Sequence, residues 1–433
     1  MEQFKFKRWL VSQAELSEGL LSILALGESV DEARGAWVLV RVFGEPVGWI
    51  KFPFDRQPAG PSDLRRLIPT DVSSRILLRL GEAGIPTPDG IPLDGWSTIG
   101  PPGFVTRQER VKSSGPTVTA VICTRDHPEG LQRCLQSLQS QDYPRLSIMV
   151  VDNAPTTNLT ALAVEASDGP HTVSYVLEPK PGLSRARNRS IREVDSEIIA
   201  WIDDDEIADH GWAVELAGAF QDSEDVCAVC GIMLPGELDT PAQIWFEQYG
   251  GHNKGRGFDP EVFSPATAAV QHPLFPLPPF GTGGNMAMRT AAVGMFGEFD
   301  PALGAGTRSM GGEDTRAITD LLLAGGTVRY QPTAVTWHFH RRDLPSLERQ
   351  LYGYGVGLAA FYASVVMDRP RLALQLVKLA PNAWREYSKP NGARLSGLDE
   401  TFPAELLKAQ RRGMIVGAVE YFLARLECRR DGN

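Results

Sequence analysis

The feature that most constrains this chain is a regular alternation of apolar strands and amphipathic helices that begins at residue 117. Nearly all-apolar strands separated by helices indicate a mostly parallel sheet with helices on both faces, which is a Rossmann-like α/β architecture. The predicted strands are TVTAVICT (117–124), LSIMVVD (146–152), TVSYVLE (172–178) and EIIAWIDDD (197–205). The predicted helices between them are PEGLQRCLQSLQSQ (128–141), LTALAVEAS (159–167) and GLSRARNRSIREV (182–194).

The chain is too long, at 433 residues, for one ordinary domain. We expect a small α+β accessory domain over 1–110, the α/β domain over 117–341 and a helical extension over 342–433. The first domain contains two strands in AWVLVRVFGEPVGWIKF, joined by a Gly-Glu-Pro turn, and then a helical pattern. Two stretches rich in Pro, Gly or Ser, 86–103 and 110–116, are predicted to form a linker.

Composition excludes several classes of protein. A net charge of −10 argues against broad nucleic-acid binding, and no apolar run approaches the ~18 residues of a spanning helix. We see no signal peptide, and five cysteines without framework spacing favour a reducing compartment, so we expect a cytoplasmic protein. The C-x-x-C over 227–230 lacks the second pair that zinc needs and is interpreted as a buried strand.

The C-terminal segment is locally basic, because residues 369–433 hold 12 Lys and Arg against 7 Asp and Glu. This composition suits peripheral contact of the C-terminal helices with anionic lipid at the inner face of a membrane, or a solvated helical surface. Both alternatives stay open, as does the oligomeric state.

Polar side chains follow all four predicted strands of the sheet. Because ligands of parallel sheets bind beyond the carboxyl ends of the strands, these positions predict a binding site, whereas packing alone does not require them. They are Thr124, Arg125, Asp126, Asp152, Asn153, Glu178, Asp203, Asp204 and Asp205.

The run Asp203–Asp205 ends a buried strand where we expect the chain to turn into a helix. Adjacent carboxylates suit Mg²⁺ or Mn²⁺ shared with a substrate diphosphate, and the alternative is an acidic helix cap. Asp152 is placed to accept a base N–H or ribose hydroxyls. Of Arg185 and Arg187 on the helix after the third strand, we assign Arg187 to the diphosphate.

Three later motifs extend the predicted site. GTGGNMAMR (281–289) brings flexible backbone at Gly283, Gly284 and Asn285 close to a ligand. Glu313 and Asp314 are expected at the start of a helix, where one of them acts as a general base or both only interact favourably with the helix dipole. In VTWHFH, His338 and His340 point the same way on a strand, so that one of them completes the metal shell or both are structural. The Gly-, Pro- and aromatic-rich stretch 233–280 is expected to be a functional loop.

Taken in order, these motifs resemble the family 2 glycosyltransferases, which have the GT-A fold, over about residues 117–341. The resemblance rests on VICTRDHPEGLQRCLQSLQSQDYP, IMVVDN, EPKPGLSRARNRSI, EIIAWIDDDEIAD, GTGGNMAMR, GGEDTRAITDLLLAGGTVRYQP and AVTWHFH.

The resemblance implies a role for each matching residue. Thr124, Arg125 and Asp126 would line the nucleotide pocket, and Asp152 would hold the base. Asp205 would be the direct metal ligand, with Asp203 or Asp204 on the ribose. Asp314 beside Glu313 would be the catalytic base, and the glycine-rich loops would shape the sugar pocket. His338 matches a histidine that some members use on the metal, while His340 departs from the pattern and leaves the acting histidine open.

The resemblance also implies an inverting transfer of a sugar from a nucleotide-diphosphate donor, UDP by family habit, as in polysaccharide biosynthesis. The acceptor hydroxyl would belong to a glycan, a lipid-linked molecule, a peptide or a small molecule. Two alternatives remain: a metal-dependent nucleotidyltransferase, and a non-catalytic sugar-nucleotide-binding protein of the same fold.

Overall fold

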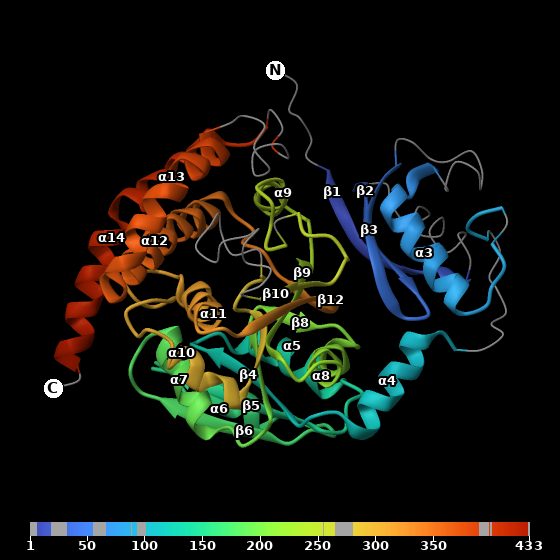
Figure 1. Ribbon diagram of the computed structural model, residues 1–433, viewed down its shortest axis with the longest axis horizontal. Coiled ribbons are helices and arrows are strands. Elements are labelled where there is room, and N and C mark those ends of the chain that lie inside the picture. The colour runs from blue at the N-terminus through green and yellow to red at the C-terminus, as the bar shows by residue number, and fades with distance from the viewer. Residues whose placement is uncertain are drawn as a thin grey trace.

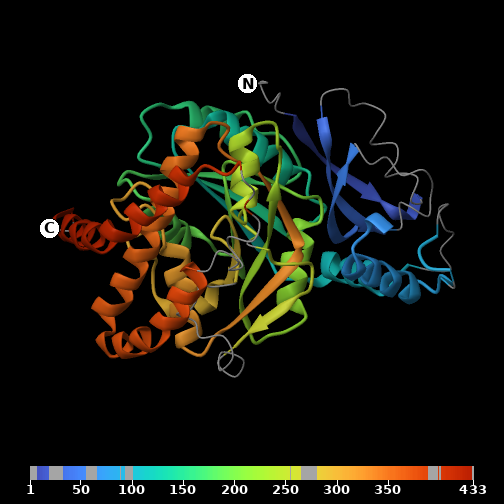
Figure 2. The same ribbon diagram turned by 90° about the horizontal axis from the view of Figure 1, so that it is seen from above.

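The computed structural model shows a central sheet with a small sheet at one end and long helices at the other (Figures 1 and 2). The residues that it describes are 7–18, 33–54, 66–87, 89–92, 101–253, 255–264, 280–388, 398 and 401–431.

The first half of the central sheet is parallel, as the alternation predicts. Its strands lie in the order β7-β4-β5-β6, and every neighbouring pair is parallel. Their carboxyl ends therefore meet at one edge of the sheet. The bounds are β4 Val118–Thr124, β5 Leu146–Asn153, β6 Val173–Glu178 and β7 Ile198–Asp203.

The second half of the sheet is mixed. β11 (Asn285–Arg289) lies antiparallel between β7 and β9 (Val226–Pro235), and β12 (Thr327–His338) runs parallel to β9. Two short strands, β8 (Glu206–Ala208) and β10 (Glu261–Phe263), pair antiparallel with β12. The pairing of β8 with the end of β12 places Glu206 opposite His338.

Helices cover both faces of the central sheet, which confirms the predicted layering. Alternate strand residues point to opposite faces, so Val121 belongs to one hydrophobic core and Ala120 and Ile122 to the other. One face carries α4 (Gly103–Ser114), α5 (Pro128–Gln139), α6 (Leu159–Glu165) and α8 (Trp212–Gln221). The other carries α7 (Leu183–Glu193), η4 (Thr290–Ala292), α10 (Val293–Phe296) and α11 (Glu313–Leu323).

The N-terminal part is a three-stranded sheet packed against one helix. It consists of β1 (Arg8–Glu15), η1 (Leu16–Glu18), β2 (Ala33–Val42), β3 (Glu45–Pro53) and α3 (Thr70–Glu82). The turn between β2 and β3 is Phe43-Gly44, with φ of 54° and 84°, and Glu45 already belongs to β3. Two positive φ angles fit the right-handed twist of a hairpin, which explains the shift from the predicted Gly-Glu-Pro turn.

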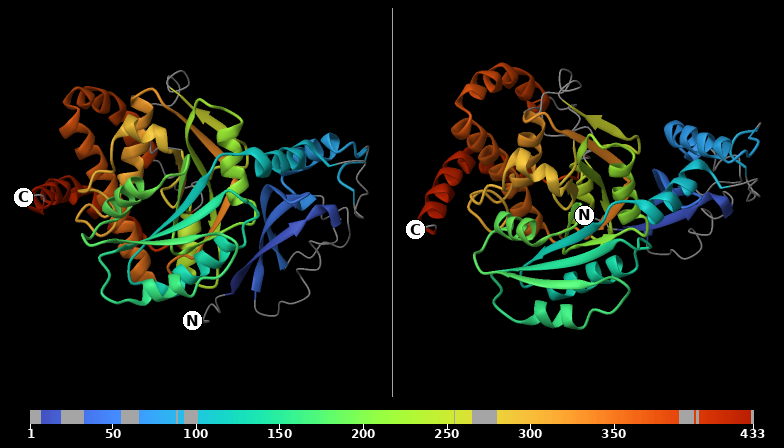
Figure 3. Two further views of the ribbon diagram at one scale, coloured as in Figure 1. Left: turned by 90° about the horizontal axis from the view of Figure 1, so that it is seen from below. Right: turned by 60° about the horizontal axis from the view of Figure 1, so that its bottom comes forward.

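The predicted linker is partly helical. Residues 93–100 lie outside the described part of the chain, but 103–114 form α4, which lies between the two sheets (Figure 3). Arg107 of α4 forms ion pairs with Glu215 at 3.2 Å and Asp222 at 2.9 Å. The polar composition of this stretch therefore reflects a helix that is anchored by charges.

Two further expectations change. The stretch 233–280 contains the end of β9, helix α9 (Pro241–Gln248) and β10, and its residues 265–279 lie outside the described part. Asp203–Asp205 are followed by β8 and not by a helix. No helix begins there for these acids to cap, so the capping alternative is removed.

The C-terminal extension is helical, as predicted. It comprises α12 (Leu344–Asp368), η5 (Pro370–Leu372), α13 (Ala373–Ser388) and α14 (Ala404–Asp431). Glycines let α12 and α14 approach closely, since a Cβ at Gly413 would lie 2.2 Å from the carbonyl oxygen of Tyr352 and one at Gly417 would lie 2.3 Å from that of Val356. Among the described helices, none has both the length and the apolar composition that a bilayer crossing requires.

A buried ion pair ties the N-terminal sheet to the central one. The Arg41 guanidinium lies 2.5 Å from a carboxylate oxygen of Asp209, which also accepts a hydrogen bond from Trp337 Nε1 at 3.1 Å. The rings of Trp49 and Trp337 pack at 6.1 Å beside this pair. The two sheets therefore form one packed body.

We predict that Arg41→Met destabilises the protein by about 3 kcal/mol, because the buried Asp209 carboxylate loses its guanidinium partner and keeps only Trp337 and the exposed His210. Urea unfolding followed by circular dichroism measures the change. Arg8→Ala is the matched control, since Arg8 is half exposed and lies 3.8 Å from Asp239, and we expect an effect within about 0.5 kcal/mol. Equal unfolding midpoints for the two variants would contradict the role of Arg41.

Candidate active site

The carboxyl edge of the central sheet opens into a cavity of about 930 Å³. The end of β7, the turn before β11, the start of α11 and the end of β12 all reach it. The central sheet, its helices and the residues adjoining them in the chain contribute Arg187, Asp203, Asp205, Gly283, Gly284, Glu313, Asp314, His338 and Arg341. The N-terminal sheet contributes Trp37, Trp49 and Lys51, and α12 contributes Gly353, Tyr354 and Gly357.

An acidic group lies at the inner end of this cavity. Carboxylate oxygens of Asp203, Asp205 and Glu206 come within 4.8 Å of one another. Both oxygens of the buried Glu206 lack a hydrogen-bond partner among the described residues. A Cβ at position 284 would lie 2.1 Å from Glu206 Oε1 and 2.7 Å from Asp203 Oδ2, so only glycine leaves this space open.

The charges of this group are incompletely compensated. Burial, with the neighbouring Asp205 and Asp204, raises the pKa of Asp203 to about 6, and burial raises the pKa of Glu206 well above its usual range. Burial would also raise the pKa of Asp205, but His338 and Arg341 outweigh it and lower that pKa. Clustered carboxylate oxygens whose negative charge is not fully balanced by the protein fit a divalent cation such as Mg²⁺ or Mn²⁺.

Asp204 is turned away from the other two aspartates. One of its oxygens accepts a hydrogen bond from Thr124 Oγ1, and the other lies 3.0 Å from His127 Nδ1. The Asp204 hydrogen bond is the main reason why the pKa of His127 is raised. In this arrangement Asp204 holds the end of β4 against the turn after β7.

Arg187 is fully buried at the back of the cavity. Its guanidinium lies 2.9 Å from Glu313 Oε1 and donates to the carbonyl oxygen of Gly283 at 3.1 Å, while Asp203 is 3.7 Å away. Burial and the adjacent Asp314 raise the pKa of Glu313 to about 7 although Arg187 opposes the shift. The predicted diphosphate residue therefore lies at the site but is engaged by Glu313.

Asp314 opens α11 with both carboxylate oxygens anchored to backbone N–H groups. Gly283 donates to Oδ2 at 2.7 Å and Thr315 donates to Oδ1 at 2.6 Å. A Cβ at position 283 would lie 2.8 Å from both Arg187 and Asp314. Glycine at 283 thus lets the loop contact both charged residues.

The predicted nucleotide residues lie at the neighbouring strand ends and are not among those that line the cavity. Arg125 is largely exposed, and Asp126 accepts a hydrogen bond from Thr156 N at 2.9 Å, which lowers its pKa. Asp152 is buried; Tyr175 donates to its Oδ2 at 2.9 Å, and its Oδ1 has no partner among the described residues.

Asn285 corrects one expectation, because it does not reach the sugar pocket. Its Nδ2 donates to the carbonyl oxygens of Ile232 and Ala334, both at 2.9 Å, and its Oδ1 accepts from Trp212 Nε1 at 2.9 Å. The side chain is fully buried. It begins β11, where the pleat points it into the sheet's core while Gly283 and Gly284 face the cavity.

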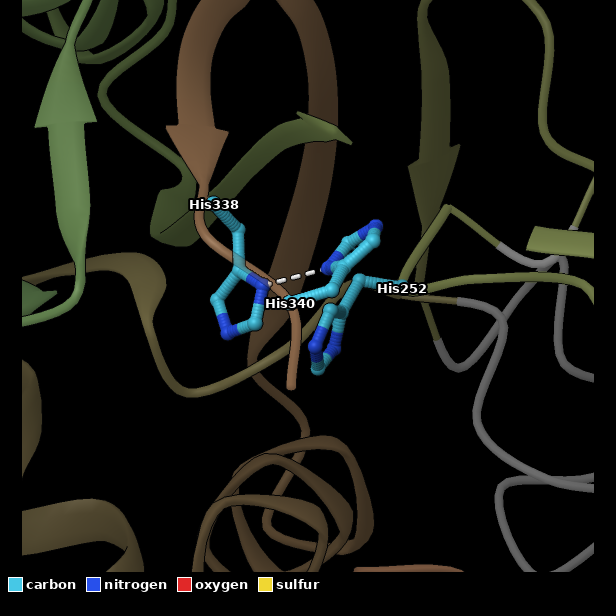
Figure 4. Close-up of side chains that lie close together, drawn as sticks. All are labelled: His252, His338 and His340. Carbon is cyan, nitrogen blue, oxygen red and sulfur yellow. Dashed lines mark hydrogen bonds between the residues drawn. The ribbon is translucent and has the colours of Figure 1, made fainter. Parts of the chain in front are cut away.

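Three histidines gather beside the acidic group (Figure 4). The Nδ1 atoms of His338 and His340 meet at 2.7 Å just at the end of β12. His338 Nε2 lies 3.5 Å from Asp205 Oδ2, and His340 Nε2 lies 2.8 Å from Glu247 Oε1. His252 adds a third ring, with its centroid 4.4 Å from that of His338.

These contacts determine where the ring hydrogens lie. Burial lowers the pKa of His340, so its ring carries one hydrogen, and an ionised Glu247 can only accept. His340 Nε2 therefore donates to Glu247, and His340 Nδ1 accepts from His338 Nδ1–H. His338 is left with Nε2 facing Asp205, where a cation would displace any hydrogen that it carries.

We predict that His340→Leu changes the tautomer of His338 and weakens Mn²⁺ binding about 10–100-fold, because the Nδ1–H loses its acceptor. Long-range ¹H–¹⁵N spectra of metal-free protein at alkaline pH report the tautomer, and Mn²⁺ paramagnetic resonance reports affinity. His210→Gln, at an exposed histidine, serves as control. A wild-type His338 with its hydrogen on Nε2 alone would refute the assignment.

The sequence prediction missed several residues of the site. Glu206 directly follows the three aspartates but was not assigned a role of its own, and Arg341 directly follows the paired histidines. His127, Glu247 and His252 come from segments interpreted as a helix start or a loop, and only the pairing of distant strands brings them here.

Residues 119–294 match the family model described as Glycosyl transferase family 2. A pre-mycofactocin glycosyltransferase of Mycobacterium tuberculosis is 27% identical over 238 residues, which are 53% of this chain and 45% of that protein. The succinoglycan biosynthesis protein ExoM of Rhizobium meliloti is 28% identical over 221 residues, 49% of this chain and 63% of its own. The chain thus spans about half the length of the first of these relatives.

Solved structures show similar folds at low identity. A mannosyltransferase of Pyrobaculum calidifontis, in complex with GDP-Man and Mn²⁺, has a TM-score of 0.46 and 17% identity, covering 76% of this chain and 94% of that one. Glucosyl-3-phosphoglycerate synthase of Mycobacterium tuberculosis has a TM-score of 0.40 and 18% identity, covering 63% and 84%. The family model, and not these structures, identifies residues 119–294 as a family 2 glycosyltransferase domain, and the strand order of the central sheet is that of a GT-A-like mixed α/β fold.

Proposed function

We propose that this chain transfers a sugar from a nucleotide-diphosphate donor to an acceptor hydroxyl, with inversion at the anomeric carbon. The observation that carries the proposal is that Asp203 and Asp205 of the acidic group and Asp314 line one cavity at the carboxyl edge of a family 2 domain. The acids supply a site for a cation and for the donor, and Asp314 supplies a base.

On the donor side, the residues offered to a cation are Asp203, Asp205, Glu206 and His338. Mg²⁺ or Mn²⁺ bound there would neutralise the negative charge that develops on the leaving nucleoside diphosphate. Arg341 lies 3.6 Å from Asp205 with about half of its side chain exposed, so it can reach a phosphate oxygen. We propose UDP as the nucleotide, with the buried Asp152 at the end of β5 as the acceptor for an N–H of the uracil base.

On the reacting side, Asp314 accepts the proton of the acceptor hydroxyl as this oxygen attacks the anomeric carbon. The two backbone N–H bonds hold the carboxylate in place for that step. Attack comes from the face opposite the leaving diphosphate, so an α-linked donor gives a β-linked product. Glu313, paired with Arg187, positions the start of α11.

We propose that the part of the cavity lined by the N-terminal sheet holds the acceptor. The partly exposed Trp49 offers a flat apolar surface that suits a sugar ring, while Lys51 lies 4.0 Å above the ring of the buried Trp37. These residues would give the N-terminal sheet a role in acceptor binding. The acceptor class stays open among glycans, lipid-linked molecules and small molecules.

Two alternatives use the same acids. A nucleotidyltransferase would attack phosphorus and release pyrophosphate, and it needs no base where Asp314 lies. A binding protein without turnover would not need Asp314 anchored beside an open acidic group. The placement of Asp314 therefore favours glycosyl transfer over both.

We predict that one nucleotide sugar of a panel is hydrolysed slowly with Mn²⁺, that EDTA abolishes the reaction, and that Asp205→Ala lowers it on the order of 10²-fold or more. Chromatography of the released nucleotide measures the rate and identifies the product. Asp142→Ala is the control, since Asp142 is exposed and pairs with Lys112. Release of pyrophosphate would instead support nucleotidyl transfer, and metal-independent turnover would refute the role of the acids.

We predict that Asp314→Asn retains nucleotide-sugar binding but loses transfer by about 10²–10⁴-fold, because the amide cannot take a proton. Calorimetry gives the donor affinity, and transfer is followed with an acceptor identified by screening. Loss of donor affinity in parallel with transfer would count against Asp314 as the base.

A further inference from the structure

The outer face of the C-terminal helices exposes an unusual amount of apolar surface. The four most exposed large apolar side chains of the described residues are all on α13 and α14: Leu374 at 73%, Val377 at 69%, Ile415 at 79% and Val419 at 61%. A helix exposes such residues at a cost unless another apolar phase covers them. This face therefore needs an occupant.

On α14 the exposed apolar residues form a continuous stripe. Ile415, Val419, Phe422 and Leu426 follow one another at intervals of four, three and four residues, which places them on one side of the helix. The opposite side is buried against α12 through Ala409, Tyr421 and Ala424 and the close-packed glycines. The stripe is thus fixed in orientation and points away from the body.

Basic side chains extend the same stripe at both ends. Lys408 and Arg411 lie seven and four residues before Ile415, and Arg429 and Arg430 lie three and four residues after Leu426, so all four are on the side of the stripe. All four side chains are exposed. Within the described part of the chain, no ion pair engages these four. The acids Glu420 and Glu427 lie to one side and pair with Arg308.

We propose that this outer face docks the protein on an anionic lipid surface. Apolar side chains in the middle would enter the boundary between headgroups and acyl chains, while the cations at the ends would bind lipid phosphates.

The same charges disfavour a second copy of the chain as the occupant. A symmetric pairing of two α14 helices, antiparallel about Val419, would bring Lys408 and Arg411 of one copy against Arg429 and Arg430 of the other. A parallel pairing would align each basic end with its own counterpart. Both arrangements set like charges against each other, whereas anionic lipid neutralises them.

The position of the face in the molecule agrees with such docking. The C-terminal helices lie at the end opposite the N-terminal sheet (Figures 1 and 2). The inner side of α12 contributes Gly353, Tyr354 and Gly357 to the cavity. A protein docked through α14 would hold its cavity next to the lipid surface.

The test is sedimentation of the full chain with vesicles of phosphatidylcholine, with and without phosphatidylglycerol. We expect binding to the anionic vesicles only, and less of it as salt rises. Ile415→Ser combined with Phe422→Ser should lower the affinity at least about tenfold, since two buried apolar side chains are removed. Arg411→Ala with Arg429→Ala should weaken binding and flatten its salt dependence.

The matched control replaces two equally large exposed residues elsewhere. Leu159 and Leu162 of α6 are 47% and 48% exposed, and their double serine variant should bind as the wild type does. Circular dichroism checks that all variants are folded. The proposal fails if the wild type stays in the supernatant with anionic vesicles, if the α6 variant loses binding equally, or if light scattering shows a dimer that the α14 variant dissolves.

Discussion

Mutual repulsion among three clustered carboxylates is the constraint on which the rest of this structure depends. Asp203, Asp205 and Glu206 are held within 4.8 Å of one another at the end of the sheet. The fold brings positive or polar groups to this point from distant segments: Arg187 from α7, His338 from the end of β12 and Arg341 just beyond it. Even so, the pKa of Asp203 stays raised at about 6, so the protein alone does not complete the neutralisation. A bound cation would complete the neutralisation, which links this edge of the sheet to the proposed chemistry.

Strand pairing accounts for how much of this could be predicted. Apolar runs that end in polar residues predicted β4, β5 and β7 to within a few residues. Because these strands are parallel neighbours, their ends then had to meet. The paired histidines were also found, because a period of two survives at the end of a strand. Their partner Glu247 could not be found in this way, since it is 93 residues away and reaches His340 only after α9 packs beneath β12.

Asn285 and α4 show the opposite failure, in which a local pattern suggested the wrong environment. Asn285 follows two glycines that do face the cavity, but side chains along a strand point to alternate faces of the sheet. Its amide therefore donates to the carbonyl groups of Ile232 and Ala334, where the pairing of β9 and β12 is interrupted. The Lys- and Ser-rich end of α4 resembles a linker in composition. Its stability comes from Arg107 bonding to two acids more than 100 residues later, which no local window contains.

The cavity is lined by two different parts of the chain. The acids and Asp314 belong to the central sheet and its helices, whereas Trp37, Trp49 and Lys51 come from the N-terminal sheet and Tyr354 from α12, which flank that fold in the sequence. Evolution can therefore change these two parts of the cavity lining separately. A lineage that keeps the central domain and exchanges its flanking segments would preserve the proposed chemical step while acquiring a new substrate range. Substrate selectivity in such proteins would then be determined by the flanking segments and not by the central domain.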